Sequence, residues 1–115
     1  CFELQRRLDN ASSSLTSIAA HPGFASTKIT RQSRWMLALT PVFGQSSDLG
    51  AWPTLRAATD PGAEGGSYWG PRWMFQLWGA PVQVRSNRAS RDASAATRLW
   101  ALSEQLTGVS FLSTP

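Results

Sequence analysis

Only two short runs of this sequence have the pattern of β-strands, and each lies between segments with helical periodicity. Residues 15–20 predict a buried strand that ends at His21-Pro22-Gly23, and residues 67–69 predict a very short strand closed by Gly70-Pro71. Strands that alternate with helices favour an α/β fold with a parallel sheet. Two strands cannot make a doubly wound sheet, because parallel strands need neighbours on their edges and cover on both faces. We therefore predict that the chain contains the end of such a fold without its beginning.

The first residues form an apolar stripe with helical spacing. Cys1, Leu4, Leu8 and Ala11 fall at i, i+3, i+7 and i+10, on one face of a helix. Helices usually open with Ser, Thr, Asp or Asn as an N-cap, and no such residue precedes Phe2. We expect the chain to begin inside a helix, with Cys1 in the hydrophobic core of the protein. The alternative is the frayed terminal helix of a complete protein.

A second helix is predicted in the middle of the chain. Ser46 or Ser47 caps it, and it runs to about Thr59. Pro53 either kinks this helix or marks its first turn. Its predicted apolar side consists of Leu49, Trp52 and Leu55.

The last helix is predicted over residues 90–106 and ends at Gly108, a residue suited to the position after a helix. The segment between the second strand and this helix, residues 72–87, is aromatic and is expected to be irregular. A short apolar helix is predicted over residues 35–43. The apolar face of the last helix consists of Ala95, Leu99, Leu102 and Leu106, with Trp100 beside it as a core residue.

Composition excludes several classes of protein. The chain has 115 residues, of which 42% are hydrophobic and 16% charged, with a net charge of +4. This suits one globular domain or part of one. No apolar run approaches the roughly 20 residues of a membrane-spanning helix, and charges near the N-terminus argue against a signal peptide. The single cysteine excludes an internal disulfide framework and a cysteine-based zinc site. We expect a soluble, cytoplasmic protein.

Candidate catalytic groups are sparse. Tyr68 and Arg72 have the spacing of a Tyr–Lys pair on a helix, but Gly70-Pro71 between them makes a helix improbable. His21 has no carboxylate nearby in the sequence and is more often structural in such a setting. The acidic residues stand apart from one another. No residue is therefore assigned a catalytic or metal-binding role.

Two other groups of residues have two interpretations each. Trp35, Trp73 and Trp78 lie in irregular segments, where they line an apolar ligand pocket or pack the loops onto a core. The arginines of the C-terminal region form an anion-binding face or the solvated start of a helix. These arginines are Arg85, Arg88, Arg91 and Arg98.

Five motifs, in the expected order, resemble the C-terminal part of the short-chain dehydrogenases/reductases, with the retinol dehydrogenase and protochlorophyllide reductase-like branch as the best match. They lie at residues 2–8 (FELQRRL), 21–27 (HPGFAST), 57–61 (AATDP), 65–71 (GGSYWGP) and 99–108 (LWALSEQLTG). Each motif alone is weak, whereas the ordered set is fairly specific. The resemblance covers nearly the whole chain.

The resemblance implies that residues 1–115 are the C-terminal part of a single Rossmann-type domain whose N-terminal cofactor-binding half is missing. Backbone groups of Pro22 and Gly23 and the hydroxyl of Thr27 would then face the nicotinamide end of NAD or NADP. Pro fixes the turn, Gly lets the backbone approach the ring, and Thr can bond the carboxamide. Residues 35–45 would form a substrate lid, with Trp35, Met36, Leu39 and Phe43 over an apolar alcohol or carbonyl.

The family's catalytic Ser, Tyr and Lys and its Gly-rich cofactor turn would all lie before Cys1, so this chain alone is expected to bind no cofactor, to be inactive and to fold poorly. DNA before the first codon should encode Tyr-x-x-x-Lys. The alternative hypothesis is a non-catalytic basic module that binds an anionic partner. The first hypothesis involves no nucleic acid, and it alone accounts for the motif from Pro22 to Thr27.

Overall fold

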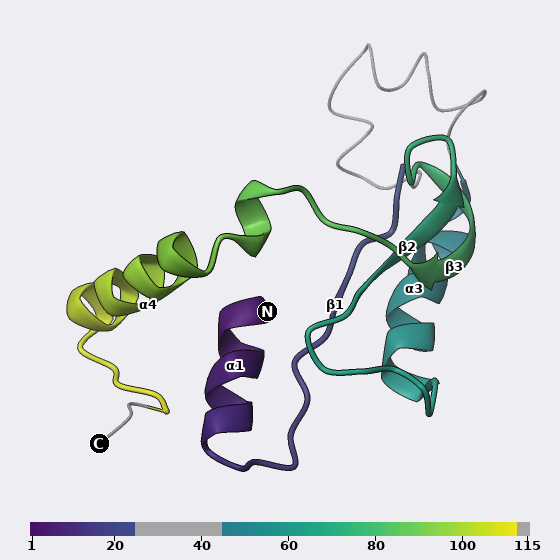
Figure 1. Cartoon of the computed structure of the whole chain (residues 1–115). Coiled ribbons are helices and arrows are strands. Elements are labelled where there is room, and N and C mark those ends of the chain that lie inside the picture. The colour runs from purple at the N-terminus through teal and green to yellow at the C-terminus, as the bar shows by residue number, and fades with distance from the viewer. Residues whose placement is uncertain (25–44, 113–115) are drawn as a thin grey trace.

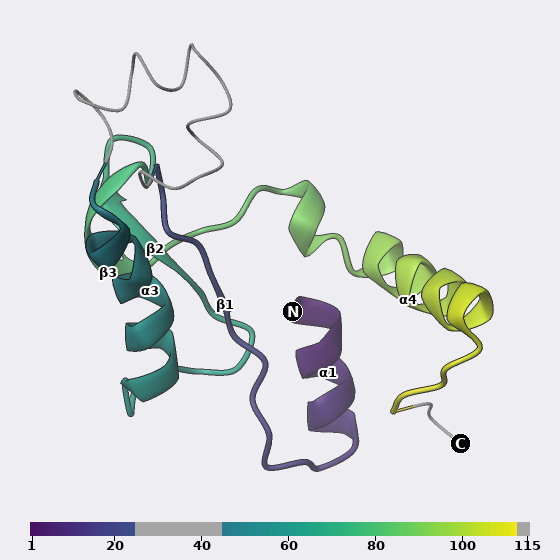
Figure 2. The ribbon, with the colours of Figure 1, turned by 180° about the vertical axis from the view of Figure 1, so that it is seen from behind.

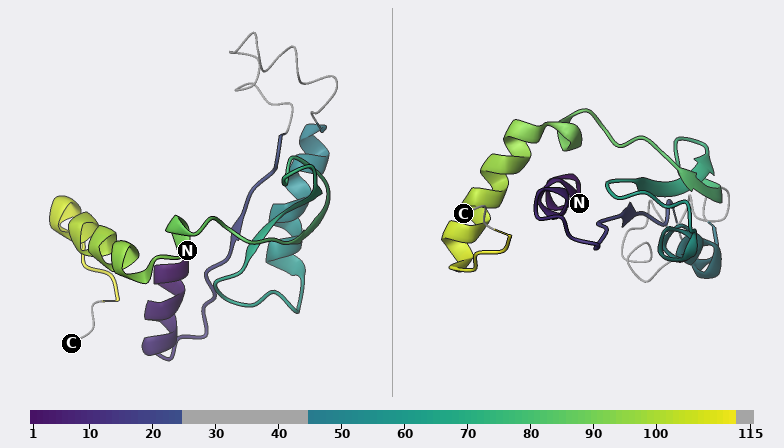
Figure 3. Two further views of the ribbon diagram at one scale, coloured as in Figure 1. Left: turned by 45° about the horizontal axis from the view of Figure 1, so that its top comes forward. Right: turned by 60° about the horizontal axis from the view of Figure 1, so that its bottom comes forward.

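Two groups of elements make up the structure, a computed structural model that describes residues 1–24 and 45–112. In Figure 1, a small sheet and helix α3 (Ser47–Thr59) form one group, and helices α1 (Phe2–Asn10) and α4 (Ala93–Thr107) form the other. The reverse view in Figure 2 shows the same separation, with the N-terminus and α1 between the sheet and α4. The segments that join them are extended apart from a short helical turn before α4, as two further directions in Figure 3 show.

The predicted N-terminal helix is confirmed. Leu8, on the expected apolar stripe, is one of the few buried hydrophobic residues, and the N-cap Cys1 makes no side-chain capping bond. The placement of Cys1 in the core is wrong, because its side chain is exposed. Its thiol lies 3.3 Å from the carbonyl oxygen of Ser17, to which it donates.

The sheet has three strands in the order β1 (Ala19–Ala20), β2 (Tyr68–Trp73) and β3 (Trp78–Gln83). β1 and β2 are parallel, with Ala19 opposite Tyr68 and Ala20 opposite Trp69, as the α/β prediction requires. The first strand is shorter than the predicted range 15–20. Pairing with β2 begins at Ala19, and just before it the Ser17 carbonyl accepts the N–H of Gly66 and the Ala19 N–H donates to Ser67.

The second strand is longer than predicted, and a third follows it. β2 continues through Gly70-Pro71, and β3 pairs with it antiparallel inside the segment expected to be irregular. Pro71 stands opposite Pro81. The bond from the N–H of Val84 to the carbonyl of Tyr68 fixes the alternation of the ladder, which puts the two prolines at a pair that needs no N–H donor. The sheet therefore accommodates both prolines, although a proline usually interrupts a strand.

α3 begins where predicted, with the Ser46 hydroxyl accepting the N–H of Leu49. Pro53 lies inside the helix, at its seventh residue, and not in the first turn. The predicted apolar side is wrong, since Leu49, Trp52 and Leu55 are all exposed. Gly50, which has no side chain, and Pro53, whose ring is compact, are buried instead, so the helix can approach the sheet closely.

α4 ends at Gly108 in the left-handed conformation, as predicted, but begins at Ala93 after a short 3₁₀ turn over Ala89–Arg91. Asp92 is its N-cap and accepts the N–H of Ala95. Its apolar stripe is not the packed face. α4 contacts α1 through half-buried Trp100, whose ring lies 4.6 Å from the Arg7 guanidinium, while Leu99, Leu102 and Leu106 are exposed.

The structure is more extended than a self-contained domain of this length. Its radius of gyration is 16.8 Å, whereas a compact 115-residue domain has about 13 Å. Among the described residues, the buried hydrophobic core reduces to Leu8 and Trp69, with Pro53 and Pro71 also fully buried. In the described ranges, no helix has the length and apolar character needed to cross a membrane.

Candidate functional site

The Pro22-Gly23 turn lies directly after β1, at the carboxyl end of that strand. Since β2 runs parallel to β1, its carboxyl end and the hairpin that follows lie at the same edge of the sheet. Open α/β sheets bind their ligands at this edge. The structure therefore places the predicted cofactor-side turn where the fold class would put a binding site.

His21 holds the turn from one side. Its Nδ1 lies 3.2 Å from the backbone nitrogen of Gly23 and accepts that N–H, so the proton of the neutral ring resides on Nε2. Nε2 lies 2.9 Å from Oε1 of Gln76 and donates to it. The ring also stacks on Tyr68, with ring centroids 5.1 Å apart. The prediction of a structural histidine fits these contacts, and both of its nitrogens have partners.

Gln45 holds the turn from the other side. Its side chain is buried, and its amide Nε2 donates to the carbonyl of Pro22 at 2.5 Å. Its Oε1 accepts the N–H of Gly79 at 3.3 Å, and its own backbone N–H donates to Phe24. A buried amide with partners at both ends fixes a single arrangement of the groups around it.

Gly23 is required by its backbone and by its surroundings. Its φ is +68°, in the left-handed region that favours glycine. A Cβ added there would lie 2.3 Å from the carbonyl oxygen of Leu77 and 2.7 Å from Cγ of Pro71. The close approach that the glycine permits in this structure is therefore to the β2–β3 hairpin.

The free hydrogen-bonding capacity of the turn is on its carbonyl groups. Pro22 has no N–H, the N–H of Gly23 is bonded to His21, and the N–H of Phe24 donates to Leu77 at 2.7 Å. A carbonyl oxygen has two lone pairs, so that of Pro22 can accept a second donor beside Gln45. This turn can thus receive an N–H donor, such as the amino group of a carboxamide, but has no spare N–H to donate.

Sequence reasoning identified His21 but missed three other residues that hold the turn. Gln45, Gln76 and Leu77 lie far from it along the chain, and only the pairing of β2 with β3 brings the last two beside it. The remaining predicted site residues lie outside the described ranges. These are Thr27 and the predicted lid residues Trp35, Met36, Leu39 and Phe43.

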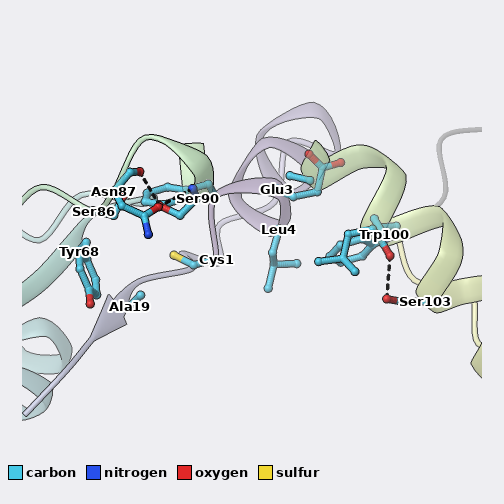
Figure 4. Close-up of a pocket in the computed structure, with 13 residues that line it drawn as sticks. Cys1, Glu3, Leu4, Ala19, Tyr68, Ser86, Asn87, Ser90, Trp100 and Ser103 are labelled. Carbon is cyan, nitrogen blue, oxygen red and sulfur yellow. Dashed lines mark hydrogen bonds between the residues drawn. The ribbon is translucent and has the colours of Figure 1, made fainter. Parts of the chain in front are cut away.

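A cavity of about 550 Å³ opens between α1, β1, the segment before α4, and α4 itself. Figure 4 shows Tyr68 and Ala19 on one side of it, Trp100 on the other, and Cys1 between them. The hydroxyl of Ser86 lies in its wall, buried and without a hydrogen-bond partner. Neither Pro22 nor Gly23 lines this cavity. Its wall brings together no acid–base pair, because the Glu3 carboxylate is already paired with Arg6 and Arg7.

Three of the four arginines singled out in the sequence lie around one concavity. Arg85, Arg88 and Arg91 line it together with Asp92, and its volume is about 510 Å³. The Asp92 carboxylate accepts the Ala95 N–H and the Ser94 hydroxyl, which lowers the pKa of that carboxyl. Asp92 is therefore engaged in capping α4. Trp73 and Trp78 lie elsewhere, half exposed on the β2–β3 hairpin.

Other charged groups of the described residues serve the helices. The pKa of Glu3 is lowered because hydrogen bonds from Arg6 and Arg7 outweigh burial, which by itself raises it. The pKa of Asp60 is lowered by the Gly62 N–H and by Arg56. Within the ranges that the structure covers, no three His, Cys, Asp or Glu side chains gather to hold a metal ion. Tyr68 and Arg72 lie on β2, so they are not a helical pair.

Comparison with known proteins finds partial matches. No protein-family model matches the chain. The chain is 32% identical over 112 residues to polyprenol dehydrogenase of Mus musculus, an alignment that covers 93% of this chain and 31% of the mouse protein. The crystal structure of an uncharacterized protein from Mycobacterium Paratuberculosis superposes with a TM-score of 0.72 and 40% sequence identity, covering 95% of this chain and 34% of that one.

The chain therefore spans about a third of the length of the mouse protein and of the mycobacterial protein. Its mixed sheet, parallel between β1 and β2, is consistent with part of a Rossmann-like α/β fold. The chain is a distant partial homologue of a dehydrogenase, which indicates a relationship to an oxidoreductase family.

Proposed function

We propose that residues 1–115 form the C-terminal part of a short-chain dehydrogenase/reductase domain, which oxidises or reduces an apolar alcohol or carbonyl with NAD or NADP. The observation that carries the proposal is the Pro22-Gly23 turn at the carboxyl end of β1, held in place by His21 and Gln45. The partial homology to polyprenol dehydrogenase supports the oxidoreductase class.

The turn fits the amide end of a nicotinamide through its acceptors. The Pro22 carbonyl, with one lone pair free, would accept the carboxamide amino group, and Thr27 would supply the hydroxyl that the turn lacks as a donor. When bound, the cofactor supplies hydride chemistry. The role of this chain is to fix one wall of its site, because the network around Gly23 leaves the turn no other arrangement of donors.

The substrate class follows from the relative. Polyprenol dehydrogenase is named for a long-chain lipid alcohol, and we propose a substrate of the same apolar kind for the enzyme that contains this chain. The predicted lid residues, among them Trp35 and Phe43, would cover it. Reaction at its hydroxyl carbon requires an acid–base group, and we propose that segments beyond this chain provide it.

A chimera tests the proposal. The third of mouse polyprenol dehydrogenase that aligns with this chain is replaced by residues 1–115, and NAD- or NADP-dependent oxidation of polyprenol is measured. We expect the chimera to turn over polyprenol. A chimera that folds and binds NAD(P) no better than a version with residues 21–24 scrambled would refute the assignment of the turn.

The second candidate is a basic module for an anionic partner, which the concavity lined by Arg85, Arg88 and Arg91 supports. It predicts retention on a polyanion column that weakens steeply with salt. Retention that vanishes in an Arg88→Gln, Arg91→Gln variant would favour it. Passage of the chain through the column at low salt would eliminate it.

A further inference from the structure

The β2–β3 hairpin ends in an exposed apolar cluster, Trp73, Met74, Phe75 and Trp78, here called the aromatic tip. Phe75 is 97% exposed, and the other three side chains are 43% to 54% exposed. Exposed apolar clusters of this kind mark interaction sites, whereas single exposed apolar residues need no explanation. The proposed cofactor turn accounts for the backbone of this hairpin but not for the side chains at its end.

The backbone of the aromatic tip is unusual. Met74, Phe75 and Gln76 have φ values of 49°, 56° and 67°, so three consecutive residues other than glycine adopt the left-handed conformation. Such conformations persist only where the surroundings impose them, and they gather at functional sites. Here the N–H of Leu77 bonds the carbonyls of Trp73 and Met74, and the Gln76 side chain bonds His21. The result is a stiff loop that projects Phe75 into solvent.

The two tryptophans flank the base of the loop. Trp73 lies under the Arg72 guanidinium, 5.7 Å from its ring centroid, and against Gly79, where a Cβ would come within 2.4 Å of its ring. Trp73 and Trp78 stand opposite each other across the hairpin. A phenylalanine at the apex with tryptophans at the base is the order that suits a lipid interface, since indole rings prefer the headgroup level and phenyl rings the acyl region.

Two arginines lie beside the aromatic tip. The Arg72 guanidinium lies over the Trp73 ring, and the backbone carbonyl of Arg85 accepts a hydrogen bond from Nε2 of Gln76. Basic residues beside an apolar insertion are attracted to the anionic headgroups of a membrane surface. A stiff, projecting aromatic tip with Arg72 and Arg85 beside it therefore suits an anionic lipid surface.

We infer that the aromatic tip docks the protein on an anionic lipid surface by inserting Phe75 between headgroups. This inference rests on the proposed function in one respect, which is that an apolar substrate dissolved in lipid would enter at the same edge of the sheet. The tip is bonded to the turn through Gln76 and His21 and through the Leu77 carbonyl and Phe24 N–H. Docking there would bring the lipid phase beside the proposed site.

Flotation of the 115-residue chain with vesicles tests the inference. The vesicles consist of phosphatidylcholine alone or of an equal mixture of phosphatidylcholine and phosphatidylserine. We expect the chain to bind the mixed vesicles and to bind the neutral ones more weakly. Phe75→Ser should lower the partition coefficient onto the mixed vesicles about tenfold, because it removes a phenyl ring that is partly buried in lipid. Arg85→Gln should weaken binding to the mixed vesicles only.

Two matched controls separate the tip from general stickiness. Phe111→Ser and Leu106→Ser remove other exposed apolar side chains, 53% and 77% exposed, from the region of α4, and we expect both to bind vesicles as the unaltered chain does. A Phe75→Ser chain that binds unchanged, or a control that loses as much, would overturn the inference. So would sedimentation that shows a dimer dissociated by Phe75→Ser, because the tip would then contact a second copy.

Failure here is distinguishable from failure of the proposed function. Vesicle binding is measured without cofactor or turnover. A tip that binds no vesicles would leave oxidation of detergent-dissolved polyprenol by the chimera unchanged, whereas an inactive chimera leaves vesicle binding unchanged.

Discussion

The close packing of Gly23 against the hairpin makes a sharp prediction, because a second glycine offers a matched control. Gly23 and Gly108 have the same φ of +68°. A Cβ at Gly23 would lie 2.3 Å from the Leu77 carbonyl oxygen, and a Cβ at Gly108 would meet nothing within 4 Å. The two alanine variants therefore share the backbone cost and differ only in steric overlap.

The expected magnitudes follow from these two contributions. A left-handed alanine costs about 1–2 kcal/mol, which is the whole expected effect of Gly108→Ala. Gly23→Ala adds an overlap with backbone, which cannot rotate away, and overpacking of this kind costs roughly 1–3 kcal/mol more. We expect Gly23→Ala to lower the free energy of unfolding by about 2–5 kcal/mol in total.

Urea unfolding followed by tryptophan fluorescence measures both variants in the chimera, where the sheet has its further strands. Buried Trp69 reports on the region beside the turn. Equal losses for the two variants would refute the packing of Gly23 against Leu77. A larger loss for Gly108→Ala would refute it still more directly.

Three further predictions concern the contacts around the site and the helices. His21→Asn keeps an acceptor for the Gly23 N–H, so the chimera should retain its affinity for NAD(P). His21→Gln keeps only the donor to Gln76, so the chimera should lose that affinity. Equal affinities of the two variants would contradict the role of Nδ1. Trp100→Ala removes the ring that contacts the Arg7 guanidinium, so α4 should lose its contact with α1. Amide hydrogens of α4 should then exchange faster in Trp100→Ala than in the control Trp52→Ala. Equal exchange rates of α4 in the two variants would contradict this role of Trp100. The pKa of Asp92 is lowered in the folded chain, so its ionised carboxylate stabilises α4 at pH values above the unfolded-state pKa of about 3.9. This stabilisation is lost as the pH falls through the folded-state pKa. Helicity measured by circular dichroism should therefore decrease below about pH 4. Asp92→Asn, which caps without titrating, should flatten that decrease, and an unchanged pH profile would contradict the assignment.

Local signals in the sequence predicted the elements that depend on local chemistry. The stripe through Leu8 gave α1, the Ser46 hydroxyl gave the start of α3, and Gly108 gave the end of α4. Capping and periodicity act within a few residues, so a single sequence contains them. The turn at Pro22-Gly23 was placed after a strand for the same reason.

The missed features depend on pairing between distant segments. Pro71 and Pro81 each argue against a strand alone, and they are tolerated because they stand opposite each other at a pair without hydrogen bonds. Gln45 became a site residue only because α3 begins beside the turn. Apolar periodicity in α4 predicted a buried Leu99, but that stripe has no partner among the described residues, and Trp100 packs instead.

The extended shape and small core have one explanation under the proposed function. β1, at one edge of the sheet, would pair with a further parallel strand, and the exposed stripes of α3 and α4 would pack against segments beyond this chain. The resemblance, the partial homology and the geometry of the turn then all support the same proposal, that this chain is one part of a larger dehydrogenase domain.

Turnover by the 115-residue chain alone tests this account most directly. The chain is incubated with a polyprenol and either NAD or NADP, and reduced cofactor is followed by its absorbance. The account predicts no reduced cofactor above the level of a sample without protein. Sustained formation of NADH or NADPH by the purified chain would mean that it contains its own acid–base group, and the assignment to one part of a larger catalytic domain would be wrong.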